Sequence, residues 1–244
     1  MSGQDGRRRD ELAAGLSQVR QRIDRACAGA QRDPAEVTLV VVTKTFPASD
    51  VAALVDLGVR DVGENRDQDA AAKVLATDVL LAAGQSRPRW HFVGQLQRNK
   101  AASVARYADV VHSVDRLALA RALGKAAHQA GRRLEVLLQV SLDDPQGASG
   151  RGGVAPSELL DLAAGVAGTE GLDLRGLMAV APLDGPPGPA FARLAGLAGQ
   201  LREQHQGATW ISAGMSGDLE EAVAHGATHL RVGSAVLGSR PSLR

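Results

Sequence analysis

The sequence has a single cysteine, few aromatic residues and almost no net charge, and each shortage excludes a class of protein. With Cys27 alone, the chain can form no internal disulfide and no cysteine-rich metal site. Aromatic residues make up only 2% of the chain, too few for a platform on which nucleic-acid bases stack. The net charge of +1 gives no electrostatic attraction to nucleic acid or to an acidic membrane. We therefore expect neither nucleic acid nor a membrane as a partner.

Long apolar runs are missing as well. The first residues, MSGQDGRRRDE, lack the apolar core of a secretory signal, and no uninterrupted apolar run approaches the roughly 20 residues of a membrane span. No set of histidine and acidic residues has metal-ligand spacing, and no serine stands in a nucleophile elbow. These absences predict a cytoplasmic protein without a metal site, in which residues 1–9 form a flexible leader.

Short apolar runs that alternate with helical patterns fill the rest of the chain. After a first amphipathic helix, whose apolar residues run from Leu12 to Cys27 at spacings of three and four, come eight strand-like runs. They are VTLVVVT (37–43), RDVGEN (60–65), WHFVG (90–94), DVVHSV (109–114), LEVLLQVS (134–141), LDLRGLMAVA (172–181), TWISAG (209–214) and THLRVGSAVLG (228–238). Ser49 and Asp115 are expected to cap two of the intervening helices.

Strands separated by helices predict right-handed crossovers and a parallel sheet, and therefore an α/β fold. Eight such units fit one closed (β/α)8 TIM barrel, with the first helix packed outside it. An open doubly wound sheet is disfavoured because no G-x-G-x-x-G motif follows the first run. We expect one domain over residues 10–240 and a short tail over residues 241–244.

Polar residues gather at the carboxyl ends of the predicted strands, where barrel active sites lie. The segments SAGMSGD and RVGSA lie toward the carboxyl ends of the seventh and eighth strands, where barrels commonly bind phosphate through backbone N–H groups. Glycines there let the backbone approach an anion, and serine hydroxyls add donors; the candidate residues are Gly214, Ser216, Gly233 and Ser234, and Ser212 ends the seventh strand at the same mouth. The alternative for Ser216 is that it only caps the helix beginning GDLEE.

Lys44 ends the first strand and has three interpretations: a solvated lysine, a point charge on a substrate, or an amine that forms an imine. Opposite a phosphate site, a lysine suits a phosphorylated aldehyde, since the anion anchors one end and the amine condenses with the other. Asn65, at the end of the second strand, and His91, within the third, are further candidates for the same mouth. His91 is equally well explained as a hydrogen-bonded structural histidine.

Arg231 shares one face of the eighth strand with His229 and Gly233, and an arginine inside a barrel is costly without a ligand. If that ligand is pyridoxal 5′-phosphate (PLP), Arg231 can donate to the ring nitrogen, which leaves the nitrogen neutral and the ring a weak electron sink. The alternative is a salt bridge to a carboxylate such as Glu64.

The motifs VVTKTFP, VGENRDQD, WHFVGQLQRNK, HSVDR, LRGLMAVAP and ISAGMSGDLEEAVAHGATHLRVGSAVLGSR resemble the pyridoxal phosphate homeostasis proteins, over about Val37 to Arg240. The resemblance implies a barrel like the N-terminal domain of alanine racemase, with PLP held as a Schiff base on Lys44. It also implies a phosphate site that includes Ser212 and Met215 beside the residues named above, and a ring-nitrogen contact from Arg231.

The same resemblance implies a role in vitamin B6 homeostasis without catalytic turnover, and therefore no catalytic residues. Apo PLP-dependent enzymes are then the candidate protein partners, and we expect a monomer. The alternative is a PLP-dependent racemase or decarboxylase of the same fold, which needs a second catalytic group on the opposite face of the cofactor. A Schiff-base aldolase is a third class, but it needs a proton-transfer partner that the sequence does not show beside Lys44.

Overall fold

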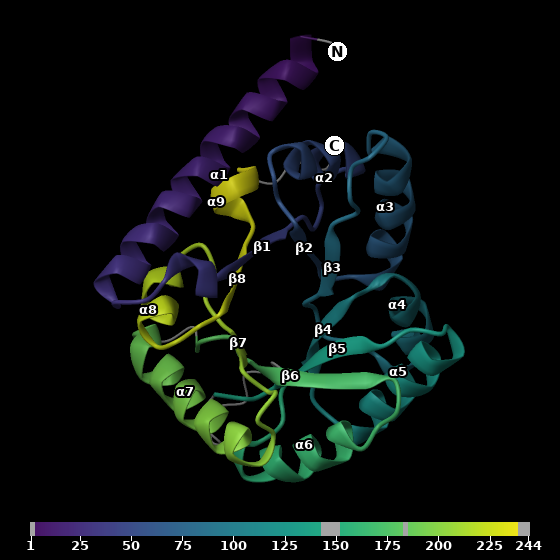
Figure 1. The fold of residues 1–244 in the computed structure, drawn as a ribbon, viewed down its shortest axis with the longest axis vertical. Coiled ribbons are helices and arrows are strands. Elements are labelled where there is room, and N and C mark those ends of the chain that lie inside the picture. The colour runs from purple at the N-terminus through teal and green to yellow at the C-terminus, as the bar shows by residue number, and fades with distance from the viewer. Residues whose placement is uncertain (1–2, 143–151, 183–184, 239–244) are drawn as a thin grey trace.

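Eight parallel strands close into one barrel in the computed structural model, which describes residues 3–142, 152–182 and 185–238 (Figure 1). Each strand pairs with the next one along the chain, and β1 pairs with β8 to close the ring. Helices surround the ring on its outside. The predicted TIM barrel is confirmed. The predicted tail over residues 241–244 lies outside the described residues.

The strands of the barrel are short and follow the apolar runs of the sequence. They are β1 (Thr38–Val42), β2 (Asp61–Glu64), β3 (Arg89–Phe92), β4 (Val110–Val114), β5 (Leu134–Gln139), β6 (Leu172–Met178), β7 (Trp210–Ser212) and β8 (His229–Val232).

One helix before the first strand and the helices that follow the strands cover the outside of the barrel. They are α1 (Gly3–Gly29), α2 (Ala48–Asp56), α3 (Asp67–Leu80), α4 (Ala101–Tyr107), α5 (Leu117–Gln129), α6 (Leu159–Ala167), α7 (Pro187–Gln204), α8 (Leu219–Ala224) and α9 (Ser234–Leu237). Three 3-10 helices accompany them: η1 (Pro34–Glu36), η2 (Arg98–Lys100) and η3 (Pro156–Glu158).

Strand β1 shows why the apolar runs are continuous rather than alternating. Val41 belongs to the apolar layer between strands and helices, whereas Val40 and Val42 face the barrel interior, where they contact the position of Gly63. Both faces of the strand are therefore buried, as parallel barrels require. The inner face of β1 is in register with that of β8, since Val40 pairs with Arg231.

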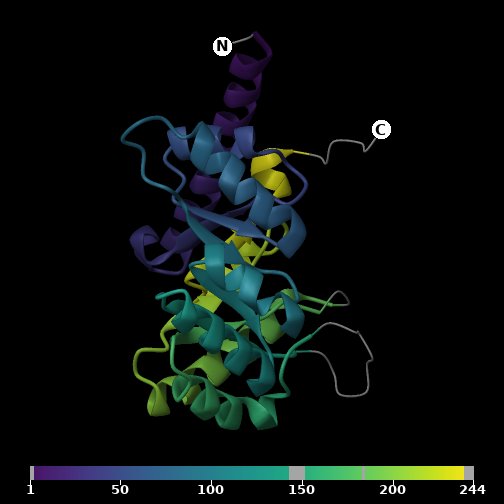
Figure 2. The ribbon, with the colours of Figure 1, turned by 90° about the vertical axis from the view of Figure 1, so that its right-hand side faces the viewer.

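Helix α1 lies outside the barrel, and Figures 1 and 2 show its first turns extending beyond the ring of strands. It packs on α2, α8 and α9 through the predicted stripe of buried residues, Leu12, Leu16, Val19, Ile23 and Cys27. The helix begins at Gly3, so residues 3–9, expected as a flexible leader, are helical instead. Arg8 gives the reason, because its guanidinium bonds both the Asp50 carboxylate and the Leu237 carbonyl.

Three element boundaries differ from the prediction. Helix α2 begins at Ala48 after Pro47, so Ser49 lies inside the first turn and caps nothing. Helix α5 has Arg116 at its N-cap, because the carboxylate of Asp115 is taken by the Arg116 guanidinium. The eighth run is a strand only as far as Val232, after which α9 follows.

Candidate functional site

A cavity of about 480 Å³ opens at the carboxyl ends of the strands, as predicted for this fold. This volume is typical of small-molecule sites. Its walls come from β1, β8 and the segments after β1, β2, β3, β6, β7 and β8. The lining residues are Val42, Lys44, Phe46, Asn65, Val93, Gly94, Val180, Met215, Ser216, Gly217, Arg231, Gly233, Ser234 and Gly238.

Lys44 lines the cavity from the turn that follows β1, and its backbone is fixed from both sides. On one side, the carbonyl of Thr43 accepts a hydrogen bond from Lys73 Nζ at 2.7 Å. On the other side, Thr45 has φ = +70°, a left-handed conformation that is strained for a β-branched residue. Such strain persists where the surrounding structure determines it and is concentrated at functional sites.

A buried ion pair supports this turn from behind. Lys73 Nζ lies 2.5 Å from Glu64 Oε1, and the Thr43 hydroxyl donates to the same oxygen at 2.7 Å. Both charged side chains are less than a tenth exposed. The pair joins the end of β1 to the end of β2, and it therefore fixes Lys44 and Asn65 relative to each other.

The serine hydroxyls predicted for phosphate binding meet at one end of the cavity. Ser234 Oγ lies 3.3 Å from Ser216 Oγ, which also accepts the Ala235 N–H at 3.4 Å. Ser216 does not cap α8, because Asp218 occupies that N-cap. Gly214 has φ = +87°, and a Cβ there would collide with Ala222, so the turn after β7 requires glycine.

Arg231 also lines the cavity, and its side chain is buried. Its Nη1 donates to Ser212 Oγ at 2.6 Å and its Nη2 to the Ala179 carbonyl at 2.8 Å. Burial lowers the pKa of Arg231 to about 10, against an opposing effect of the Asp218 charge, so the guanidinium stays cationic at neutral pH. The alternative salt bridge to Glu64 does not form, because Glu64 pairs with Lys73.

Seven of the ten predicted site residues line the cavity: Lys44, Asn65, Met215, Ser216, Arg231, Gly233 and Ser234. Ser212 lies behind Arg231, and Gly214 shapes the turn behind the lining. His91 does not line the cavity either. Its ring is buried and bonded to His112 Nε2 at 2.8 Å and to Asp61 Oδ1 at 2.9 Å.

Sequence reasoning missed the apolar lining, above all Phe46 and Val180, which carry no chemical signature. Gly94 was also missed, and there the chain passes so close to Asn65 that a Cβ would overlap the Asn65 carbonyl. The glycine in WHFVG was the available signal, since a glycine that ends a strand marks a close approach.

The lining is electropositive. Among the described residues, Lys44 and Arg231 are its only charged side chains, and no acidic residue, histidine, cysteine or tyrosine belongs to it. Nor do the described ranges contain a group of three or more His, Cys, Asp or Glu residues that could hold a metal ion. No helix among them is long and apolar enough to cross a membrane.

The cavity lining fits an anionic aromatic ligand such as PLP, because it combines two cations, paired hydroxyls and an apolar wall.

Comparison with known proteins agrees with this geometry. Residues 15–241 match the family described as alanine racemase, N-terminal domain. A pyridoxal phosphate homeostasis protein of Mycobacterium tuberculosis is 45% identical, covering 96% of this chain and 94% of that protein. The chain belongs to the pyridoxal phosphate homeostasis protein family.

Solved structures that are similar to this chain include a relative and an alanine racemase. PipY of Synechococcus elongatus, solved with PLP bound, has a TM-score of 0.79 and 33% identity and covers 93% of this chain and 100% of its own. Alanine racemase of Corynebacterium glutamicum has a TM-score of 0.68 at 14% identity, which shows a shared fold alone. It covers 96% of this chain and 62% of the racemase. The predicted family and fold are thus confirmed.

Proposed function

We propose that this protein binds PLP in the cavity, holds it as a Schiff base on Lys44 and serves in PLP homeostasis without catalytic turnover. The observation that carries the proposal is that one cavity is lined by Lys44, Arg231, Ser216 and Ser234 together. The bound PLP of PipY and the name of the relatives support the same ligand.

Each lining group has a distinct task in this proposal. The hydroxyls of Ser216 and Ser234, with neighbouring backbone N–H groups, receive the phosphate. The Lys44 amine condenses with the aldehyde carbon of PLP and releases one water. Arg231 donates to the ring nitrogen. Because a guanidinium has no hydrogen-bond acceptor, that nitrogen stays unprotonated, and the ring withdraws electrons weakly.

The absence of turnover is supported by the lining of the cavity. Racemisation or decarboxylation requires a second acid or base beside the cofactor. Besides Lys44, the described lining offers only Arg231, amide, hydroxyl and apolar groups. Tyr107, the single tyrosine, ends α4 in a buried position and does not line the cavity; burial also raises the pKa of its phenol. The racemase and decarboxylase alternative therefore lacks a partner for Lys44.

Covalent trapping tests the proposal. The protein is loaded with PLP, reduced with borohydride, digested and mapped by mass spectrometry, and we expect the pyridoxyl group on Lys44. An adduct confined to Lys73, Lys100 or Lys125 would overturn the assignment. Lys44→Ala is the control: it should bind PLP weakly and reversibly, because the phosphate-binding groups remain. A Lys44→Ala protein that folds but binds no PLP would contradict binding through the phosphate.

Turnover is tested separately. The PLP-loaded protein is incubated with L-alanine in D2O, and exchange of the Cα hydrogen is followed by NMR. We expect no exchange above that of free PLP, and exchange that disappears in Lys44→Ala would establish the enzyme alternative instead. Delivery of PLP to apo enzymes and the monomeric state stay predictions.

A further inference from the structure

A continuous row of hydrogen bonds crosses the barrel interior from the cavity wall toward the opposite end. Arg231 Nη1 donates to Ser212 Oγ at 2.6 Å, and Ser212 Oγ lies 2.8 Å from His112 Nδ1. His112 Nε2 lies 2.8 Å from His91 Nδ1, and His91 Nε2 lies 2.9 Å from Asp61 Oδ1. The row thus connects β8, β7, β4, β3 and β2, and it ends on the first residue of β2.

The chemistry of the two ends determines where every hydrogen in the row lies. Arginine can only donate, so Ser212 Oγ accepts from Arg231. The hydroxyl of Ser212 is buried, and its other partner is His112 Nδ1, so its own hydrogen goes to that nitrogen. Burial holds the pKa of His112 well below its usual value, so the neutral ring carries its one hydrogen on Nε2. That hydrogen faces His91 Nδ1, which must accept it. His91 therefore carries its hydrogen on Nε2 and donates to Asp61.

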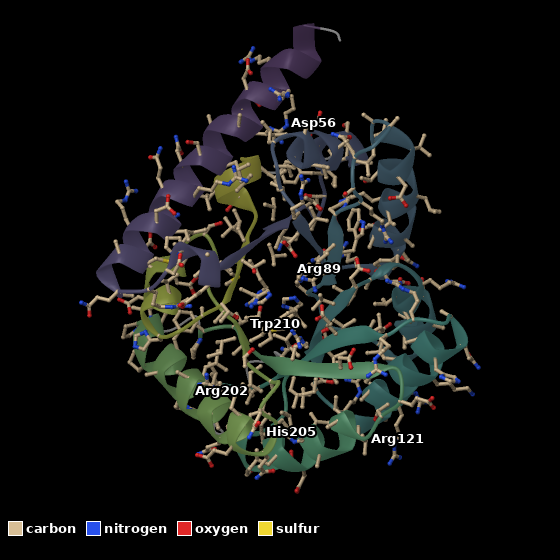
Figure 3. All side chains as sticks on the ribbon, in the orientation of Figure 1. Asp56, Arg89, Arg121, Arg202, His205 and Trp210 are labelled. Carbon is tan, nitrogen blue, oxygen red and sulfur yellow. The ribbon has the colours of Figure 1, made fainter. Side chains whose placement is uncertain are left out.

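The acceptor at the far end fits this direction. Burial by itself raises the pKa of Asp61, but the hydrogen bond from His91 and the positive charge of Arg89 outweigh that effect and lower the pKa overall. Arg89 Nη1 lies 3.8 Å from Asp61 Oδ1, and Figure 3 shows Arg89 and Trp210 in the middle of the ring of strands. Asp61 is thus a carboxylate that can only accept, and all four bonds point the same way.

We propose that Asp61, His91, His112 and Ser212 form a positioning chain that orients Arg231 toward the cofactor in the cavity. Ser212 Oγ and the Ala179 carbonyl each take one Nη of the guanidinium, and this leaves its other N–H groups for the cavity that Arg231 lines. Because His112 takes the Ser212 hydrogen, the serine lone pairs stay available to Arg231. The identity of the ligand in this inference rests on the proposed function. The hydrogen bonds of the positioning chain themselves do not depend on a ligand.

His229 provides a matched control in the same interior. Its ring centre lies 6.3 Å from that of His91 and 6.4 Å from that of His112, and it is buried like them. Its contacts differ from theirs: Nδ1 lies 2.9 Å from Thr228 Oγ1, and the ring lies against Trp210. A change at His229 therefore alters the histidine cluster without breaking the row that leads to Arg231.

The first test uses the unliganded wild-type protein. Nitrogen-15 NMR of the imidazole rings at pH 7 should show His91 and His112 as neutral rings with the hydrogen on Nε2. The signals are assigned with His91→Gln and His112→Gln. A hydrogen on Nδ1 of either ring would reverse the row and overturn the proposal.

The second test measures binding of two probes, pyridoxamine phosphate and inorganic phosphate, by calorimetry. His112→Phe removes the acceptor for Ser212 and keeps a flat ring, so affinity for pyridoxamine phosphate should fall about tenfold or more. Affinity for inorganic phosphate should not change, because Ser216 and Ser234 are untouched. His229→Phe should leave both affinities within about twofold, and His112→Gln, whose amide both accepts and donates, should recover part of the loss.

A double-mutant cycle shows whether the effect passes through Arg231. In the Arg231→Ala background, His112→Phe should change the affinity for pyridoxamine phosphate less than about twofold. An undiminished effect in that background, or equal losses in His112→Phe and His229→Phe, would overturn the positioning role. If His112→Phe does not fold, the same cycle with His112→Asn and the wild-type NMR spectrum decide the question. A wild-type protein that binds neither PLP nor pyridoxamine phosphate would contradict the proposed function. The NMR spectrum of the His91 and His112 rings would still test the positioning chain.

Discussion

At the scale of single residues, the Lys44 turn depends on a buried ion pair, Lys73 with Glu64, that is not part of the cavity lining. Replacing Lys73 with Met would leave the Glu64 carboxylate buried without its cation and free the Thr43 carbonyl. We expect Lys73→Met to lower the free energy of unfolding by about 3–5 kcal/mol, measured by urea unfolding.

Two further variants isolate the cause. Glu64→Gln in the Lys73→Met background should recover most of the loss, because the amide oxygen still accepts from Thr43 and no charge remains. Lys125→Met, on the exposed face of α5, should change stability by less than about 0.5 kcal/mol. Equal stabilities of Lys73→Met and Lys125→Met would show that the buried pair contributes nothing.

Thr45, next to Lys44, carries the strain of the turn in its own backbone. Asparagine adopts the left-handed region more readily than a β-branched residue, and the Thr45 side chain is exposed. Thr45→Asn should therefore raise the free energy of unfolding by about 0.5–1 kcal/mol, seen as a higher Tm. Thr45→Val keeps the β-branch and should give no gain; a gain of the same size in both variants would refute the strain argument.

At the scale of elements, α1 supports the side of the cavity that carries Ser216 and Ser234 from outside the barrel. Arg22 donates to the Ser216 carbonyl at 2.9 Å and pairs with Glu220 at 2.7 Å. Gly15 lies against α9, where a Cβ would come within 2.5 Å of the Val236 carbonyl oxygen. The extra helix thus fixes both segments that carry the site serines.

Gly15→Ala should force α1 and α9 apart. We expect a loss of about 1–3 kcal/mol in the free energy of unfolding, together with weaker binding of inorganic phosphate, measured by calorimetry. Gly6→Ala is the matched control in the same helix, because nothing lies within 4 Å of its Cβ position. It should stabilise α1 by about 0.5–1 kcal/mol, as alanine does in a helix interior. If Gly15→Ala stabilises the protein as much as Gly6→Ala does, the close contact with α9 is unimportant.

The elements also show what the sequence could predict. Continuous valine and leucine runs separated by helical periodicity were enough for the barrel, because both faces of its strands are buried. The carboxyl ends of all the parallel strands lie at the same end of a barrel, so Lys44 and Arg231 could be placed together at that end. The partners of the Arg231 guanidinium could not be predicted, since Ser212 on β7 and the Ala179 carbonyl after β6 meet it only through the register of the closed sheet. The helical start of α1 was not predicted, because the sequence alone does not show that Arg8 bonds the carboxylate of Asp50, a residue far away in the chain.

At the scale of the whole molecule, the barrel has a ligand cavity at one end and a group of buried histidines in its interior. Burial lowers the pKa of His229 to about 3 and holds that of His112 well below its usual value. In the unfolded chain both rings take up protons below about pH 6.5, whereas in the fold they stay neutral. The unfolded state then binds more protons than the folded state, so acid favours unfolding.

The free energy of unfolding should therefore fall as the pH drops from about 6.5 to 4.5, by up to about 1.4 kcal/mol per pH unit for each of the two rings. Carboxylates whose pKa is lowered in the fold, such as Asp61, add to this loss only near and below their unfolded pKa of about 4, so the histidines dominate the window. Urea unfolding at several pH values measures the slope. His229→Phe removes one of the two rings and should reduce the slope by about half, whatever it does to stability at pH 7. Identical slopes in the wild type and in His229→Phe would mean that His229 is already protonated in the folded barrel, which its burial against Trp210 argues against.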